Sequence, residues 1–361
     1  MKARVLFVGR TRYRLPLSDG LARKWDALAE RMDLRVVASG TGSDPRFHLV
    51  PPRPLDGPSF YLALPLALAS ELRSFRPDVV IAESPYEAAA AELARTLARS
   101  RAKVIVEVHG DWRVWSSHYG SRSRALLRPV SDAVAGWAVD HADGSRAVSG
   151  FTASLLEGRG RRPLGVFTTY SDLTSFTGPT VPVPSERRVI FVGVLERYKN
   201  VEGLARAWRI VVERVPGAHL HLVGSGTLTD VAEDLARAGA SWDHRLEPVE
   251  VSAAFDRSRA LLLPSASEGL PRIGIEAFLR GRAVVATRAG GIPDLVQDGV
   301  NGLLVDLGDT AALAAAIERV LTDDELAARL GAGAAADAAH WVSTPAEYAG
   351  RVADVVEAVL A

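Results

Sequence analysis

Residues 264–305, PSASEGLPRIGIEAFLRGRAVVATRAGGIPDLVQDGVNGLLV, contain the most informative pattern of the chain. They follow an apolar run, RALLLPS at 259–265, and predict a helix from about Pro271, because proline is favoured in the first helical turn. Two further strand-like runs come next, RAVVAT at 282–287 and GLLV at 302–305. Strand, helix and strand in this order are typical of a parallel sheet with helices packed on its faces.

The same alternation of short β-branched runs and longer helical stretches occurs in both halves of the chain. In the first half, strands are expected at 3–9, 34–39, 78–83, 103–110 and 144–149, with helices at 20–31, 59–74 and 86–99. In the second half, strands are expected at 187–193, 218–224, 259–265, 282–287 and 302–305. The pattern predicts an α/β protein with two doubly wound parallel sheets.

A proline-rich segment at residues 171–187 separates the two halves and lacks any apolar period. We expect it to link an N-terminal domain, residues 1–175, to a C-terminal domain, residues 176–344. The last segment, 345–361, predicts one amphipathic helix that begins with a proline. In a doubly wound sheet, ligands bind at the carboxyl ends of the strands, so the expected site is a central cleft between the two domains.

Length and charge narrow the class of protein. The chain has 361 residues, 48% of them apolar and 24% charged, which is more than a single core of roughly 250–300 residues usually holds. Its net charge is zero, but residues 1–180 carry 25 basic and 18 acidic side chains, so the first half is +7 and the second −7. A nucleic-acid-binding protein is not expected, because the surface as a whole is not basic.

Cysteine is absent, which excludes disulfides, thiolate catalysis and cysteine-based zinc sites. The start of the chain, MKARVLFVGR, has fewer apolar residues than the stretch of about 7–15 in a secretory signal. The most apolar stretch, residues 60–69, has about half of the ~20 residues that a membrane-spanning helix needs. These features predict a cytoplasmic protein.

Candidate binding residues lie in the loop and helix that follow the strand at 259–265. Glu268 and Glu276 are eight positions apart, one in the loop and one in the helix, so they can contact different parts of an extended ligand. Gly269 and Leu270 present backbone N–H groups at a helix N-terminus, where phosphate is favoured. The alternative is that Glu268 merely starts the helix, that Glu276 lies on a solvated face and that the glycines form ordinary turns.

Other polar residues also follow predicted strands. Lys199, in FVGVLERYKN at 191–200, either binds an anion or lies on a solvated helix start. In LVGSGTL, residues 222–228, the third glycine of a dinucleotide-binding fingerprint would fall at Thr229, which disfavours an oxidoreductase. His109 and Asp111, in VEVHGD, end a strand, and a purely structural histidine is the alternative.

Taken together, these segments resemble the family 4 retaining glycosyltransferases, which have the GT-B fold. The resemblance is carried by five ordered elements: the Ser265–Gly269 segment, the Glu268–Glu276 spacing, a strand, the Gly290–Asp294 loop and the Gly299–Leu304 element. It covers nearly the whole chain and is most specific in the second half. It implies two Rossmann-like domains facing a central cleft, with the C-terminal helix crossing back to the first domain.

The resemblance also implies roles for residues of the second domain. Glu268 and the neighbouring amides of Gly269 and Leu270 would hold the donor sugar and its phosphates, and Glu276 would accept hydrogen bonds from the ribose hydroxyls. Lys199 matches the family's lysine beside the diphosphate. Val194 stands where the family often has an arginine, and Arg197 would replace that arginine. Gly193 and Gly224 match the glycine turns that lie against the substrate.

In the first domain the resemblance places His109 beside the hydroxyls of the donor sugar and Asp111 next to it in the binding site. The family usually has two glycines before its first long helix, and this chain has Asp19 and Gly20. Gly20 would still let a phosphate or an acceptor approach the end of that helix.

The implied activity is a retaining, metal-independent transfer of a sugar from a UDP- or GDP-linked donor to an acceptor, by a bacterial enzyme without metal or cofactor. The alternatives are a GT-B sugar-nucleotide epimerase and a non-catalytic sugar-nucleotide-binding protein. The basic residues Arg10, Arg12, Arg14, Arg23 and Lys24, with the apolar stretch 60–69, suggest an anionic or lipid-linked acceptor. They also suggest peripheral contact with the inner face of the membrane.

Overall fold

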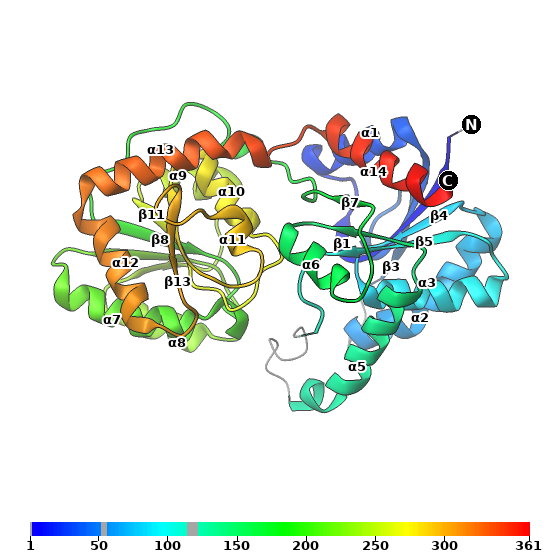
Figure 1. Cartoon of the computed structure of the whole chain (residues 1–361), viewed down its shortest axis with the longest axis horizontal. Coiled ribbons are helices and arrows are strands. Elements are labelled where there is room, and N and C mark those ends of the chain that lie inside the picture. The colour runs from blue at the N-terminus through cyan, green and yellow to red at the C-terminus, as the bar shows by residue number, and fades with distance from the viewer. Residues whose placement is uncertain (1, 52–55, 114–121) are drawn as a thin grey trace. The chain divides into compact units, whose positions relative to one another are not determined.

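The computed structural model describes residues 2–51, 56–113 and 122–361 and divides the chain into two compact units (Figure 1). Unit 1 consists of Ser123–Asp172, Ser343–Ala361 and the described residues before position 114, and unit 2 of Leu173–Val342. Each unit contains one parallel sheet with helices on both faces. The predicted pair of Rossmann-like α/β domains is therefore confirmed.

The sheet of unit 1 has seven parallel strands in the order β3-β2-β1-β4-β5-β6-β7. The strands are β1 (Arg4–Arg14), β2 (Asp33–Thr41), β3 (Phe47–Val50), β4 (Val79–Ala82), β5 (Lys103–Val108), β6 (Gly144–Ala147) and β7 (Gly165–Val166). The helices are α1 (Asp19–Arg31), α2 (Asp56–Ser74), α3 (Pro85–Ala98), α5 (Arg122–His141), α6 (Gly150–Glu157) and α14 (Pro345–Leu360). The order of the strands reverses between β1 and β4.

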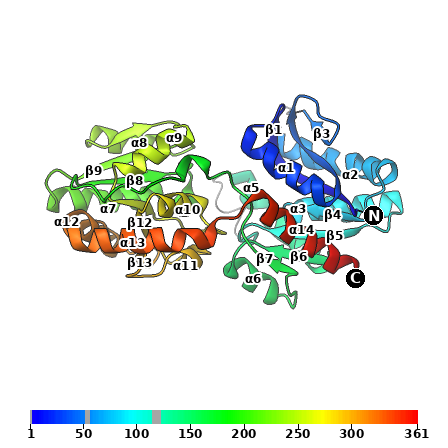
Figure 2. The ribbon, with the colours of Figure 1, turned by 90° about the horizontal axis from the view of Figure 1, so that it is seen from above.

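Alternate residues of the unit 1 strands face two separate cores, as a sheet buried on both faces requires. Leu6 and Val8 of β1 pack with α2, α3 and part of α5, whereas Val5 and Phe7 pack with α1 and α14. Figure 1 and Figure 2 both show α14 lying along α1. The C-terminal helix thus belongs to the N-terminal unit, as predicted.

The sheet of unit 2 has six parallel strands in the order β10-β9-β8-β11-β12-β13. The strands are β8 (Arg188–Val192), β9 (His219–Val223), β10 (Ser241–Asp243), β11 (Ala260–Leu263), β12 (Ala283–Thr287) and β13 (Gly302–Val305). The helices are α7 (Val201–Arg214), α8 (Thr229–Arg237), α9 (Pro248–Asp256), α10 (Arg272–Leu279), α11 (Ile292–Leu295), α12 (Thr310–Thr322) and α13 (Asp324–Trp341). Two 3-10 turns, η1 (Thr174–Phe176) and η2 (Arg197–Lys199), complete the unit.

Some predicted limits differ from the structure. The first strand does not end at residue 9, because β1 continues to Arg14 beyond an irregularity in its pairing with β2. The short strands β3, β7 and β10 lie at or next to the sheet edges and were not predicted, since two to four residues give no readable alternation.

The apolar stretch 60–69 forms part of α2, and its residues divide between two environments. Phe60, Leu64 and Leu68 are buried in the core, whereas Leu62 and Leu66 are exposed. Among the described residues, no helix combines the length and the apolar character needed to cross a membrane.

Candidate functional site

Lys199 and Glu268 form an ion pair at the point where the strand order of the unit 2 sheet reverses. Lys199 follows β8 and Glu268 follows β11, and these two strands are neighbours. The Lys199 Nζ donates to Glu268 Oε1 over 2.6 Å, and each side chain is only 12% exposed. Ligands of doubly wound sheets bind at this reversal point, so the pair lies where a ligand is expected.

Backbone contacts between the two loops hold this pair together. The Ala266 N–H donates to the Tyr198 carbonyl over 2.6 Å, and Asn200 Nδ2 donates to the Pro264 carbonyl over 3.1 Å. Asn200 adopts a left-handed conformation, φ 53°, at the start of α7, which asparagine tolerates better than most residues. Lys199 is thereby fixed beside Glu268 before any ligand arrives.

The Gly-Gly loop after β12 supports Glu268 from a third strand. The Gly291 N–H donates to the Glu268 carbonyl over 2.8 Å. Gly290 has φ 55°, and a Cβ atom at this position would lie 2.2 Å from the Glu268 carbonyl oxygen. Only glycine allows this close approach. The Ser265–Gly269 segment and the Gly290–Asp294 loop, which are separate elements in the sequence, therefore pack against each other.

Glu276 lies in the second turn of α10 and is 5% exposed, which excludes the alternative of a solvated face. Its Oε1 lies 2.9 Å from Nε of Arg272, one turn earlier. Burial raises the pKa of Glu276, although the charge of Arg272 opposes this effect. Gly269 is buried and Leu270 half-buried just before the helix, so the loop and helix carry the predicted residues on adjoining turns.

The glycines after β8 and β9 lie against each other. Gly224 has φ 143°, and a Cβ atom on it would lie 1.9 Å from the Gly193 carbonyl oxygen. Gly193 in turn donates its N–H to the Val223 carbonyl over 3.0 Å and borders the aliphatic part of Lys199. These glycines therefore allow the two loops to pack closely, and their predicted contact with substrate stays a prediction.

Arg197 is exposed on η2, and its substitution for the family arginine also stays a prediction.

Unit 1 has a comparable polar pair at its own reversal point, between β1 and β4. Thr11 donates its hydroxyl to Glu83 Oε2 over 2.9 Å. Gly9 is needed beneath this contact, because a Cβ atom there would lie 1.9 Å from the same oxygen. Burial raises the pKa of Glu83, with the positive charge of Lys24 opposing it. Thr11 and Glu83 were not identified from the sequence.

His109 is held from both sides of its ring. Its Nε2 lies 3.1 Å from Glu107 Oε2, and its Nδ1 lies 3.3 Å from the Thr169 hydroxyl. Glu107 accepts a hydrogen bond from Nε2, and the Thr169 hydroxyl can donate to Nδ1 or accept from it. The side chain remains 38% exposed, so the histidine is both oriented and accessible.

Glu107 links His109 to the buried Arg146. Arg146 Nε lies 2.9 Å from Glu107 Oε1, and its Nη2 donates to Thr169 over 3.1 Å. Burial by itself would raise the pKa of Glu107, but the Arg146 charge and the His109 hydrogen bond lower it to about 2. The network thus contains a carboxylate that stays ionised at neutral pH directly behind His109.

Three residues of unit 1 that the sequence suggested for binding, Gly20, Asp111 and Lys24, contact other residues of the same unit. Gly20 lies in the first turn of α1, where a Cβ atom would meet Asp172 Oδ2 at 2.0 Å. Asp111 accepts hydrogen bonds of 2.8–3.0 Å from Arg113. Lys24 is buried with its Nζ 4.7 Å from the ring centroid of Trp25, and burial lowers its pKa. The expectation that Lys24 belongs to a basic surface is therefore wrong.

The missed residues left weak signals in the sequence. Glu83 ends a predicted strand, a position typical of ligand-binding residues in doubly wound sheets. Glu107 interrupts the apolar run KVIVEV, where a charge needs a buried partner. That partner, Arg146, lies on β6, and the prediction of a strand there does not show that it is the neighbour of β5.

The two sheets, each with polar residues at its reversal point, define a two-domain α/β protein of the GT-B class. Two family models match most of the chain: "Glycosyltransferase Family 4" over residues 21–167 and "Glycosyl transferases group 1" over residues 186–323. The chain belongs to glycosyltransferase family 4.

Curated relatives and solved structures agree with this assignment. The chain is 32% identical to the D-inositol 3-phosphate glycosyltransferase of Thermobifida fusca over 53% of its own length and 50% of that protein. It is 28% identical to the lipopolysaccharide core biosynthesis glycosyltransferase LpsE of Rhizobium meliloti, over 74% of this chain and 73% of LpsE. The chain spans about half the length of the first curated relatives that it matches.

Among solved structures, sucrose-phosphate synthase of Thermosynechococcus elongatus superposes with a TM-score of 0.76 at 18% identity, covering 99% of both chains. The HepE protein of Anabaena, in complex with UDP-glucose, gives a TM-score of 0.71 at 18% identity, again over 99% of both chains. At this level of identity the two likenesses support the fold alone.

Proposed function

We propose that this protein transfers a sugar from a nucleoside-diphosphate sugar to an acceptor, with retention of configuration and without a metal ion. The observation that carries the proposal is the Lys199–Glu268 pair at the reversal point of the unit 2 sheet. A nucleoside diphosphate needs a fixed cation near its phosphates, and a sugar needs a hydrogen-bond acceptor for its hydroxyls. The pair supplies both groups, and its two residues lie in segments by which the chain resembles family 4.

In the donor complex, Lys199 binds the diphosphate and Glu268 turns to the sugar. A phosphate that replaces Glu268 as the partner of Lys199 offsets part of the cost of separating the ion pair. Glu276 accepts the ribose hydroxyls, and Arg272 keeps that carboxylate oriented. The solved structures of the Anabaena HepE protein contain UDP or UDP-glucose, which supports a UDP-linked donor, with a GDP-linked donor as the alternative.

In the transfer step, the bond between the sugar carbon C1 and the diphosphate oxygen breaks, and a bond to the acceptor oxygen forms on the same face. The acceptor proton passes to an oxygen of the departing phosphate, so no protein nucleophile is required. Lys199 stabilises the negative charge that develops on the leaving group.

Unit 1 supplies the acceptor side of the reaction in this proposal. His109 offers an oriented imidazole, and the Thr11–Glu83 pair offers a hydroxyl and a carboxyl group beside it on the same sheet edge. We propose a lipid-linked or anionic acceptor and a cytoplasmic enzyme in peripheral contact with the membrane.

The function is tested by incubating the protein with UDP- and GDP-linked sugars, with and without bacterial lipid extracts. Release of nucleoside diphosphate that requires an acceptor supports transfer. Isomerised sugar nucleotide without acceptor would instead support the epimerase, and ligand-induced thermal stabilisation without turnover would support a binding protein.

Replacing Glu276 with alanine is expected to weaken nucleoside diphosphate binding by about 10- to 100-fold, because hydrogen bonds to a charged group contribute about 1.5–3 kcal/mol. Isothermal titration calorimetry with UDP and GDP measures the change. Glu318→Ala is the matched control, since it removes a carboxylate of unit 2 that pairs with Arg214 instead. Unchanged affinity in the Glu276 variant would refute the assignment.

Chelation of divalent ions is expected to leave the transfer rate within about twofold of its starting value, because Lys199 provides the charge that a metal ion would otherwise supply. The measurement compares initial rates in EDTA with rates in added Mg²⁺ or Mn²⁺. Loss of activity in EDTA that either ion restores would show that the reaction depends on a metal.

A further inference from the structure

One face of unit 1, formed by α2, α3 and α5, carries many exposed apolar side chains. The exposed residues are Leu62, Leu66, Leu93, Leu97, Val130, Val134 and Trp137. We call this surface the α2–α3–α5 face. Single exposed apolar residues are common, but a group on adjoining helices of one unit marks an interaction surface.

A groove of 620 Å³ runs between the three helices of this face. Tyr61 and Pro65 of α2 form one side, Leu93 of α3 lies along it, and Val134 and Trp137 of α5 form the other side. Apolar and aromatic side chains thus line most of its surface. The groove would offer an alkyl chain few polar partners.

Helix α2 is apolar on its outer face as well as on its inner one. Leu62 and Leu66 lie one turn apart and are 81% and 71% exposed, whereas Leu64 between them is fully buried. The core therefore accounts for Leu64 but not for the two outer leucines. Their exposure to water is unfavourable, so a partner that covers them would be bound by the hydrophobic effect.

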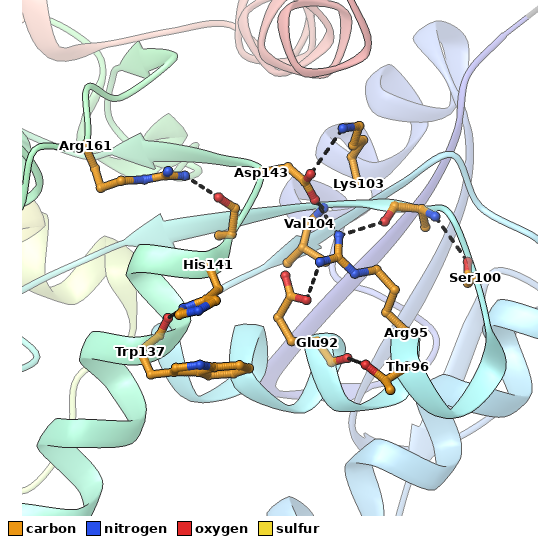
Figure 3. Close-up of polar contacts among 12 residues, drawn as sticks. Glu92, Arg95, Thr96, Ser100, Lys103, Val104, Trp137, His141, Asp143 and Arg161 are labelled. Atoms are coloured by element: carbon orange, nitrogen blue, oxygen red, sulfur yellow. Dashed lines mark hydrogen bonds and ion pairs between the residues drawn. The ribbon is translucent and has the colours of Figure 1, made fainter.

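The polar residues at the groove are neutralised within the protein, as Figure 3 shows. Glu92 pairs with Arg95 over 2.6 Å, and Arg95 also binds Asp143 over 2.6 Å. Trp137 is fixed by stacking on His141, with ring centroids 4.8 Å apart. The groove therefore presents a rigid indole and no unpaired carboxylate charge to an approaching partner.

Basic side chains lie at the carboxyl ends of α2 and α3, where Leu97 is also exposed. The exposed ones are Arg73, Arg76, Arg99 and Arg101, whereas Lys103 pairs with Asp143 over 3.2 Å. The acidic residues of this end, Glu71, Asp78 and Asp143, accept hydrogen bonds from other groups of unit 1. The α2–α3–α5 face is thus apolar along its helices and positively charged at the carboxyl ends of α2 and α3.

We propose that the α2–α3–α5 face docks on an anionic lipid bilayer, with Leu62 and Leu66 inserted between the lipids and an acyl chain in the groove. The inference deepens the membrane contact proposed above and rests on it. Charge complementarity favours the bilayer: basic side chains at one end of an apolar face match anionic headgroups above acyl chains. A second copy of the same face would instead bring like charges together.

This face differs from the basic surface expected from the sequence. Lys24 is buried, and Arg23 pairs with Asp172 over 3.1 Å. Both belong to α1, which packs on the opposite side of the sheet from α2 and α3. The stretch 60–69, which the sequence also suggested as a membrane contact, contributes Leu62 and Leu66 to the docking face.

The test is sedimentation of the full chain with phosphatidylcholine vesicles, with and without phosphatidylglycerol, at low and high salt. Wild type is expected to bind anionic vesicles at low salt, and the double variant Leu62→Glu with Leu66→Glu at least about tenfold less. Leu307→Glu is the matched control, because Leu307 is an exposed leucine of unit 2. It is expected to bind vesicles as the wild type does.

A second readout locates the contact. Lipids brominated on the acyl chain are expected to quench tryptophan fluorescence in the wild type, and Trp137→Phe is expected to remove most of that quenching. Thermal unfolding is measured for every variant, because an unchanged transition shows that unit 1, which carries the substitutions, is still folded. UDP affinity is measured as well, because it separates failed docking from failure of the proposed transferase function, which concerns unit 2.

Three results would overturn the proposal. The first is that wild type stays in the supernatant with anionic vesicles, and the second is that the double variant binds as well as wild type. A wild-type dimer in light scattering that the double variant loses would show instead that this face joins two copies of the chain.

Discussion

Replacing Lys199 with alanine is expected to lower turnover by about 100- to 1,000-fold, the loss typical when one fixed group that stabilises developing charge is removed. The structure places its Nζ 2.6 Å from Glu268, inside a site where the side chain is only 12% exposed. A cation in so enclosed a position is screened little by water, so its charge acts strongly on a departing diphosphate. Steady-state rates at saturating donor and acceptor measure the effect.

Lys199→Arg is the informative companion variant. Arginine retains the charge but not the compact shape, so it should recover part of the lost rate. A variant that releases Glu268 from its partner also needs a check of folding, which thermal unfolding provides. A turnover close to wild type in Lys199→Ala would exclude the proposed role of this residue.

Replacing Glu107 with glutamine is expected to lower the free energy of unfolding by about 3–5 kcal/mol, because it leaves the charge of Arg146 buried without its partner. Arg146 is 1% exposed and Glu107 is 6% exposed, so water cannot replace the missing carboxylate. Urea unfolding at pH 7, followed by tryptophan fluorescence, measures the change. The double variant Glu107→Leu with Arg146→Met is the control and should recover most of the stability, since it removes both charges.

The pH dependence of stability gives an independent readout of the same pair. The pKa of Glu107 is about 2 in the folded chain and 4.5 as a reference value, so the folded state favours the ionised form. Its contribution is present above pH 4.5 and is lost as the pH falls from 4.5 towards 2. Glu107→Gln should lack this part of the acid transition, and identical acid profiles for the two proteins would contradict the assignment.

The unit 2 site was largely predictable because its residues follow long, strongly apolar strands. Lys199 and Glu268 are separated by 69 positions, yet each follows a predicted strand. The carboxyl ends of parallel strands meet at one edge, so placing the residues after strands was enough to bring them to the same edge. The direct contact between them depends on β8 and β11 being neighbours, which strand prediction alone does not establish.

The unit 1 network was not predictable in the same way. Glu107 and Arg146 lie within strands, where apolar residues are expected, and each is tolerated only because the other is its neighbour across the ladder. One sequence contains no signal that pairs two such residues. His109 was found from its place at a strand end, but the partners that orient it, Glu107 and Thr169, were not.

The edge strands and some element limits failed for a different reason. β7 has two residues and β10 three, and their pairing depends on the neighbouring strand rather than on local propensity. The extension of β1 to Arg14 likewise depends on pairing with β2 beyond Val8. Local pattern therefore predicts the interior of each sheet better than its borders.

The position of α14 has a consequence for the order in which the protein folds during synthesis. Unit 2 is formed by the continuous stretch 173–342, whereas unit 1 needs Tyr348, Val352 and Val356 of α14 to close the core around Trp25. Domains usually fold in the order in which they leave the ribosome. Here the half that is made second can reach its final form first, and the half that is made first must wait for α14.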